Sequence, residues 1–141
     1  LKKSLRGKVT GQMGHVMDIM ATCLDLSGAE YPATYDGNRI IPLEGKSLVP
    51  VLRKGEREGH DYLGFEHFNE RAFLSKEGWK IVRQGNKHPW ELYDLNNDRS
   101  EQHDLAKQNP AKVEELTKAY EEWAKRCMVE PYPGQFKKNK K

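Results

Sequence analysis

Four short apolar segments between residues 61 and 95 constrain the fold of this chain more than any other feature. They span 61–68, 70–76, 79–84 and 90–95, and apolar side chains alternate with polar ones along them, as in strands that bury one face. Turn signals at 76–78 and 85–89 separate the last three segments. The spacing predicts a four-stranded antiparallel meander with short connections.

A helix is predicted after the meander. Asn109 is a suitable N-cap, and Pro110 suits the first helical position. One apolar stripe follows at alternating spacings of three and four: Val113, Leu116, Tyr120, Trp123 and Cys127. Such a stripe is sized to lie across one face of the sheet. Trp79 and Trp90 stand at sheet spacing and are predicted as core, although Trp90 beside His88 is also a candidate for lining a sugar site.

A second apolar helix is predicted over residues 13–27, with Gly28 as its stop. Its apolar side chains surround the helix almost completely, so it needs burial on most sides, and a short chain offers little to bury it against. Cys23 and Cys127 each fall on an apolar helical stripe without a CxxC or zinc spacing, which predicts two buried free thiols. Residues 29–59 form a Gly- and Pro-rich connector, with a short helical turn predicted around 47–52.

Charge and hydropathy disfavour two classes of partner. The net charge is only +3, and part of it lies in the last five residues, Lys137–Lys141, so the positive charge is a tail and not a face. A nucleic-acid-binding body is therefore disfavoured. No apolar run reaches the length of a membrane span, and the first twelve residues lack the pattern of a signal peptide.

An acidic stretch follows the last predicted strand. Asp94, Asn96 and Asp98 stand at alternate positions, as ligands do in a calcium loop. An EF-hand loop needs Gly at its sixth position and Glu at its twelfth, and here those positions hold Arg99 and Leu105. The stretch is therefore predicted to be a turn in which Asp and Asn side chains bond nearby backbone N–H groups.

Four motifs appear in an order that carries a resemblance. The first two are GHVMDIMATCLDLSGAEYP at 14–32 and DGNRIIPLEGKSLVPVLRKG at 36–55. FEHFNERAFLSKEGWKIV follows at 65–82, and WELYDLNNDRSEQHDLA at 90–106 precedes an Asn-Pro cap and a helix ending in Trp-Ala. Over residues 13–133 the chain resembles the C-terminal portion of the arylsulfatase family, which comprises formylglycine-dependent, alkaline-phosphatase-like sulfatases. Ala21 stands where that family usually has Pro.

The resemblance implies an α+β fold: a four-stranded antiparallel sheet with a packed C-terminal helix, preceded by one helix belonging to a larger α/β sulfatase domain. The implied organisation is a terminal helix of that large domain at 1–30, a connector at 31–60, a small sheet-plus-helix subdomain at 61–133 and a basic tail at 134–141. The chain is thus expected to be the last part of a longer enzyme, with the upstream catalytic domain as its partner. A stand-alone binding module without catalysis is the alternative.

The implied activity of the parent is hydrolysis of sulfate esters, either aryl sulfates or sulfated carbohydrates. Family members use a formylglycine made from a C/S-x-P/A-x-R motif, together with a calcium ion. Cys23 is followed by Leu-Asp-Leu-Ser and Cys127 by Met-Val-Glu-Pro, so neither fits that motif. The fragment alone is expected to be inert, without a nucleophile or metal site. Family members are commonly periplasmic or secreted, which is the expected location here.

Three residues are candidates for the substrate side of the parent: Glu66, His67 and Arg71. His67 could donate a hydrogen bond to a sugar hydroxyl or sulfate, and Arg71 could pair with an anionic group. The alternatives are that His67 packs beside Leu63 on its strand face and that Arg71 pairs with Glu66. The family usually has Asn immediately before this arginine, and Glu70 stands there instead, which weakens any role carried over from that Asn.

Overall fold

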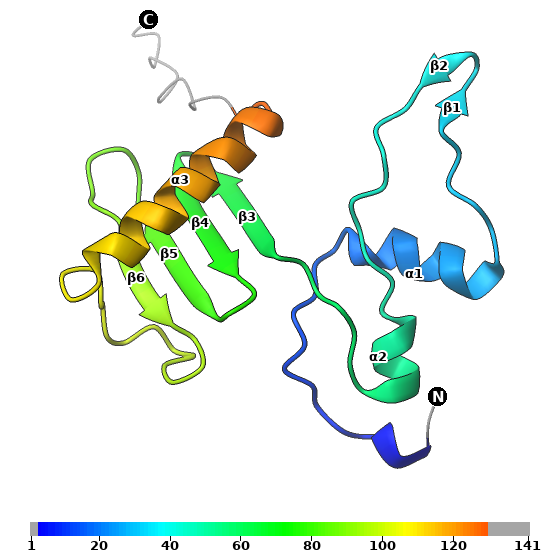
Figure 1. Ribbon diagram of the computed structural model, residues 1–141, viewed down its shortest axis with the longest axis horizontal. Coiled ribbons are helices and arrows are strands. Elements are labelled where there is room, and N and C mark those ends of the chain that lie inside the picture. The colour runs from blue at the N-terminus through cyan, green and yellow to red at the C-terminus, as the bar shows by residue number, and fades with distance from the viewer. Residues whose placement is uncertain (1–2, 130–141) are drawn as a thin grey trace, which may run out of the picture. The chain divides into compact units, whose positions relative to one another are not determined.

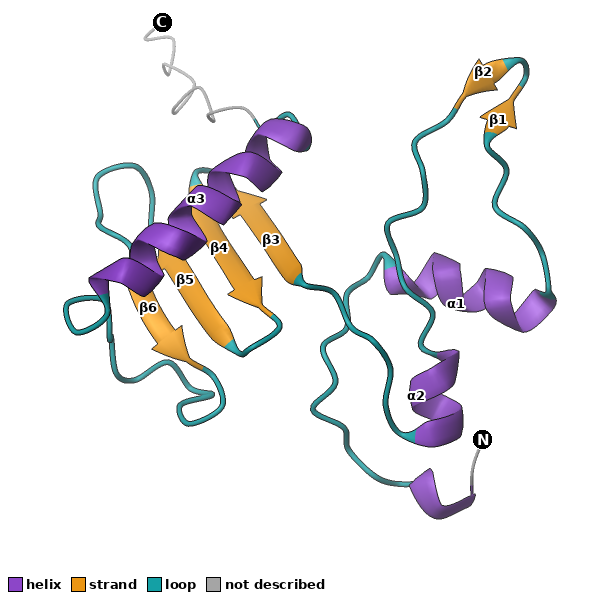
Figure 2. Ribbon diagram, in the orientation of Figure 1, coloured by secondary structure: helices purple, strands orange, loops and turns teal. Residues whose placement is uncertain are grey.

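A computed structural model describes residues 3–129 of the chain. It divides into two compact units, Leu1–His60 and Asp61–Lys141. Figure 1 labels the elements of each unit, and Figure 2 colours them by type. The predicted basic tail at 134–141, and the end of the predicted subdomain at 130–133, lie outside the described residues.

The first unit contains short elements joined by long connections. They are a 3-10 helix (η1, Lys3–Leu5), helix α1 (Asp18–Ser27), a two-stranded hairpin (β1, Thr34–Tyr35, and β2, Asn38–Arg39) and helix α2 (Val49–Lys54). Helix α1 begins at Asp18, not at Met13 as predicted, because the Asp18 side chain accepts the His15 N–H 2.9 Å away and the chain before it turns instead of coiling. The helical turn predicted around 47–52 is helix α2.

Helix α1 leaves most of its apolar surface exposed in this structure. Ile19 is 59% exposed and Leu26 is 63% exposed, whereas Ala21 is buried. The prediction of buried thiols is wrong, since Cys23 and Cys127 are both exposed, although both are free. Cys23 lies on the uncovered side of α1, and Cys127 lies just after the last turn of the C-terminal helix, where the apolar stripe no longer faces the sheet.

The second unit is the predicted meander with its helix. Strands β3 (Tyr62–His67), β4 (Glu70–Ser75), β5 (Trp79–Arg83) and β6 (Glu91–Asp94) pair antiparallel in sequence order. Helix α3 (Pro110–Arg126) lies across one face of the sheet (Figure 2). These elements confirm the predicted α+β class, the four strands and the C-terminal helix.

The core of the second unit lies between that sheet face and α3. Five side chains are buried there: Phe73, Ile81, Leu92, Leu116 and Tyr120. Trp79 and Trp90 pack against this core, as predicted, and Trp90 meets Tyr120 edge-on at 5.3 Å. Gly64 lets the ring of Trp123 approach the backbone of β3, because a Cβ at this position would collide with that ring.

The acidic stretch after β6 is the predicted turn. Asp94 Oδ1 accepts the Asn96 N–H at 3.0 Å. Asp98 Oδ2 accepts the N–H groups of Gln102 and His103 at 2.7 and 2.8 Å. These carboxylates therefore accept hydrogen bonds from the backbone, which confirms the predicted turn. The same bonds position the segment that leads into α3.

Candidate functional site

The most enclosed charge of the first unit is the carboxylate of Asp18, at the start of α1. The side chain is fully buried and accepts four hydrogen bonds. Oδ1 accepts the Lys46 N–H at 2.8 Å and lies 2.7 Å from His60 Nε2. Oδ2 accepts the His15 N–H at 2.9 Å and Arg57 Nη2 at 2.7 Å. One carboxylate thus ties α1 to both flanking connections.

These contacts determine the ionisation of Asp18. Burial alone would raise its pKa, because a low-dielectric surrounding disfavours the charged form. The bonds from Lys46 N–H, Arg57, His15 N–H and His60 outweigh that penalty and hold the pKa well below its usual value. Asp18 is therefore a carboxylate at any physiological pH, paired directly with a buried guanidinium.

Arg57 extends this cluster to the backbone. Its side chain is buried, and it donates to the carbonyls of Met13 (2.8 Å), Ser47 (3.2 Å) and Lys46. Gly45 permits the close approach, since a Cβ there would collide with the carbonyl of Met17. The lone pairs of Asp18 are already used by four donors, so the cluster holds the connector in place and does not offer an open ligand.

The resemblance implies a calcium ion for the family, and the described residues can be tested as its ligands. Calcium binds six to eight oxygen ligands, mostly carboxylates and carbonyls. Within residues 3–129, no group of three or more His, Cys, Asp or Glu side chains could hold a metal ion. The described residues therefore do not supply a ligand set for this ion.

The candidate substrate-side residues lie at one end of the sheet of the second unit. Glu66 and Arg71 are partners in the β3–β4 register and so share a face, the face covered by α3. His67 points to the opposite face, where it is exposed and its ring lies 4.2 Å from that of Phe68. The structure therefore brings Glu66 and Arg71 together and separates His67 from them.

Arg71 does not pair with Glu66 in this structure. Arg71 Nη2 donates to Asn86 Oδ1 at 3.0 Å, and Glu66 Oε1 accepts the Asn69 N–H at 2.8 Å. Asn69 and Phe68 both have positive φ, 70° and 52°, and make the two-residue turn between β3 and β4. Glu66 thus stabilises a tight turn, while Arg71 holds the β5–β6 loop.

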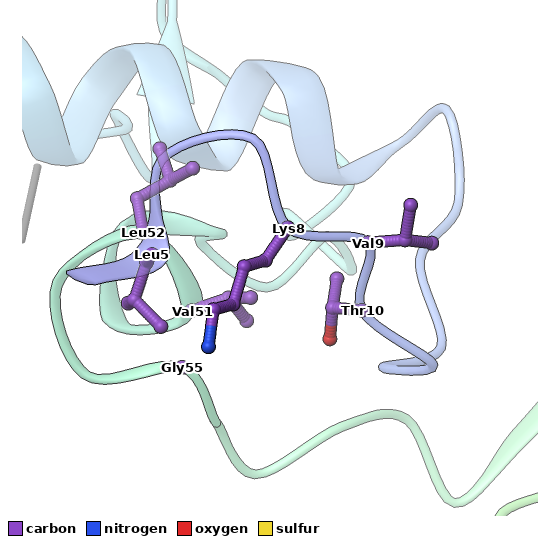
Figure 3. A pocket seen from close by; sticks show the side chains of 7 residues that line it. All are labelled: Leu5, Lys8, Val9, Thr10, Val51, Leu52 and Gly55. Atoms are coloured by element: carbon purple, nitrogen blue, oxygen red, sulfur yellow. The ribbon is translucent and has the colours of Figure 1, made fainter. Parts of the chain in front are cut away.

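A cavity of about 190 Å³ opens between the N-terminal segment and α2 (Figure 3). Seven residues line it: Leu5, Lys8, Val9, Thr10, Val51, Leu52 and Gly55. The side chains are mostly apolar, with one ammonium from Lys8 and one hydroxyl from Thr10. Hydrolysis needs a nucleophile with an acid or base beside it, and these groups do not supply that pair.

Comparison with known proteins gives the family. The family described as N-sulphoglucosamine sulphohydrolase, C-terminal, matches residues 2–130. The chain therefore belongs to this family of sulfatase C-terminal regions. No helix in residues 3–129 is both long and apolar enough to cross a membrane.

Two curated relatives and a solved structure agree with this family. An uncharacterised sulfatase of Schizosaccharomyces pombe is 34% identical over 107 residues, which cover 72% of this chain and 19% of that protein. The ulvan-active sulfatase of Formosa agariphila is 29% identical over 151 residues, covering 84% of this chain and 30% of the relative. The crystal structure of Ps i-CgsB matches 86% of this chain and 26% of its own, at 23% identity and a TM-score of 0.63, which shows the shared fold. The chain thus spans less than a third of each.

The sequence analysis missed two arrangements that the structure makes. It did not single out Asp18 with Arg57 and His60, although an aspartate between the apolar residues Met17 and Ile19 is a signal for a buried, paired carboxylate. It also missed Arg83, which lies in the β4–β5 register directly opposite Arg71. The signal for that pair was weak, because it depends on the length of the turn at 76–78.

Proposed function

We propose that this chain is the C-terminal part of a sulfatase, a sulfuric ester hydrolase acting on a sulfated carbohydrate or an aryl sulfate. The single observation that carries the proposal is the family match over residues 2–130. The family description concerns sulphoglucosamine, and one relative is named for activity on ulvan, which favours a carbohydrate over an aryl sulfate. The chain covers 19% of one relative and 30% of the other, which supports the proposal that it is part of a longer protein.

The catalytic groups belong to the remainder of the parent in this proposal. Formylglycine and calcium are the cofactors that the resemblance implies for that part. Asp18, the buried carboxylate of the first unit, is already saturated by four donors. The 141-residue chain alone should therefore not turn over sulfate esters. A periplasmic or secreted location is proposed on the resemblance alone.

The exposed apolar side of α1 supports a partner within the same parent. Side chains that are more than half exposed gather on this helix and the turn before it: Val16, Ile19, Met20 and Leu26. Contiguous apolar surface of this kind marks an interface in a soluble protein. We propose that the upstream catalytic domain covers it, so that the sheet-plus-helix unit follows a helix belonging to the larger body.

The substrate-side role stays a proposal for Glu66, His67 and Arg71, with a division between them. Glu66 and Arg71 share the α3 side of the sheet at its β3–β4 end, and His67 lies on the other side of the same turn. A ligand that contacts all three would have to pass round the edge strand β3. Arg71, whose guanidinium can bind an oxyanion bidentately, is the strongest candidate of the three.

The test is to obtain the coding region upstream of Leu1 and to assay the whole protein. We expect an in-frame C/S-x-P/A-x-R motif and turnover of sulfated sugar by the full-length protein, with none by residues 1–141. A start codon close to Leu1, or a full-length protein that binds sulfated sugar without releasing sulfate, would contradict the proposal and favour a non-catalytic binding module.

A further inference from the structure

Two arginines face the same way at the end of the sheet in the second unit. Arg71 of β4 and Arg83 of β5 are directly paired in the strand register, so their side chains leave the sheet on the same face, one strand apart. Both are partly exposed. Like charges directly opposite each other destabilise a sheet, so this pair needs a source of compensation.

Within the described part of the chain, the acceptors that bond these two arginines are neutral. Arg71 Nη2 donates to Asn86 Oδ1 at 3.0 Å. Arg83 donates from Nη2 to the Asn86 carbonyl at 2.7 Å and from Nε to the His88 carbonyl at 2.8 Å. These bonds use one N–H of Arg71 and two of Arg83, whereas a guanidinium carries five.

No carboxylate of the described residues neutralises either guanidinium. The ion pairs found in residues 3–129 involve neither Arg71 nor Arg83. Glu66, the acid nearest to Arg71 in the register, directs Oε1 to the Asn69 N–H. The loop thus holds both guanidinium groups in place, and their remaining N–H groups have no acceptor among residues 3–129.

A buried hydroxyl of α3 lies on the side of the sheet that carries both arginines. Tyr120 is 4% exposed, and its hydroxyl has no hydrogen-bond partner among residues 3–129. Burial raises the pKa of Tyr120, the charge of Arg71 lowers it, and the charge of Glu66 raises it, so this hydroxyl is in electrostatic range of both groups. A buried hydroxyl without a partner is costly to the folded state.

We propose that Arg71 and Arg83, held by the β5–β6 loop, form a binding site for an oxyanion group of a carbohydrate. The guanidinium fork matches sulfate and carboxylate oxygens bidentately, and both groups occur as substituents on acidic sugars. The choice of a carbohydrate as carrier rests on the proposed function; the oxyanion chemistry rests on the two arginines. Glucosamine 6-sulfate and glucuronate are the probes that distinguish the two substituents.

The experiment is an NMR titration of the ¹⁵N-labelled 141-residue chain with each probe, at ionic strength matched with sodium chloride. We expect saturable shifts of the Arg71 and Arg83 side-chain signals and of the Asn86 amide, with no saturable shift at Arg39 in β2. A larger effect of glucosamine 6-sulfate identifies a sulfate site, and a larger effect of glucuronate identifies a carboxylate site. Shifts that are linear in both probes and equal at Arg39 would overturn the proposal.

Three variants sharpen the assignment. Arg83→Gln should raise the dissociation constant about tenfold or more, as expected for loss of a charge-assisted hydrogen bond. Arg83→Lys keeps the charge and removes the fork, so an intermediate loss is expected. Arg39→Gln removes the same charge from the other unit and should change nothing. Unchanged binding in Arg83→Lys and Arg83→Gln would overturn the proposal.

The core signals of Ile81 and Leu92 report whether each variant is folded. If Arg83→Gln loses them, the titrations of the unaltered chain and of Arg83→Lys decide the question. Binding is read here without turnover. A sulfatase assay of the parent that fails therefore leaves this result standing, and absent binding leaves the assay of the parent unaffected.

Discussion

Each of the two units is stabilised by a different kind of interaction. The second unit buries large apolar side chains between a sheet and a helix, among them Phe73, Ile81 and Leu92. Among residues 3–60, the buried apolar side chains are smaller, Ala21, Val49 and Val51, and the carboxylate of Asp18 is buried as well. An apolar core spreads its stabilisation over many contacts, whereas a buried charge concentrates it on one group and its partners. The first unit should therefore be the more sensitive to single substitutions and to acid.

The largest effect is expected from Asp18→Ala. It removes the acceptor of four donors and leaves the guanidinium of Arg57 buried without its counter-charge. Breaking a buried ion pair in this way costs about 3–5 kcal/mol. Hydrogen exchange at the Lys46 and Leu48 amides should become fast, while the Ile81 amide keeps its protection. Glu30→Ala, which removes an exposed carboxylate of the same unit, is the matched control.

Equal loss of protection in both units after Asp18→Ala would contradict the contrast between them. It would mean that the carboxylate supports the whole chain. Unchanged exchange in the first unit would mean that the apolar contacts of Val49 and Val51 suffice there.

Gly64→Ala should disturb the second unit alone. The added methyl would meet the ring of Trp123, which must move away from the surface of β3. Overpacking of this kind costs about 1–3 kcal/mol. The midpoint of urea unfolding, followed by tryptophan fluorescence, should fall. Gly59→Ala is the control, because a Cβ there meets no atom within 4 Å. An equal fall in both variants would show that the close contact with Trp123 carries no weight.

Acid should separate the two units. The pKa of Asp18 is lowered in the folded state, so its stabilisation is complete above the unfolded value near 3.8 and is lost as the pH falls below it. As the pH falls from about 4 to about 2, amides of the first unit should therefore lose protection before those of β5. If β5 loses protection first, then the surface carboxylates of the second unit, such as Asp98 with its lowered pKa, dominate instead.

The smallest effect is expected from Tyr120→Phe without ligand. The hydroxyl is buried and has no partner in the described part of the chain, so its removal should leave stability unchanged or raise it by up to about 1 kcal/mol. Thermal unfolding of the second unit measures this change. A clear loss of stability would reveal a bond to the hydroxyl that the folded chain makes in solution. Trp123→Phe, which removes packing next to the same ring, should instead destabilise the unit.

Much of the second unit was predictable because its signals are local. The alternation of apolar and polar residues predicted the strands, and the turn residues at 76–78 predicted the connection between β4 and β5. The Asn109-Pro110 pair and the apolar stripe after it predicted the position of α3. The first unit was less predictable. The expected helix from Met13 was too long, and both thiols were expected to be buried, because periodicity reports an apolar stripe but not whether another element covers it.

The candidate site was predictable only in part. The sequence marked Arg71 and Glu66 through a motif but placed no weight on Arg83, since only the strand register brings that residue opposite Arg71. It likewise could not join Asp18 to Arg57 and His60, which come from a connector without periodicity. Contacts of this kind depend on the path of the chain between the partners.

By itself the sequence determined the class of fold, the order of its elements and the resemblance to sulfatase C-terminal regions, because hydrophobic period and short motifs are written locally along the chain. Only the tertiary structure decided which charges are buried, which are paired and which remain free to meet a ligand. Electrostatic energy depends on the distance between charges and on their access to solvent. Residues as far apart in the chain as Asp18 and His60 come close together, away from solvent, only when the chain folds.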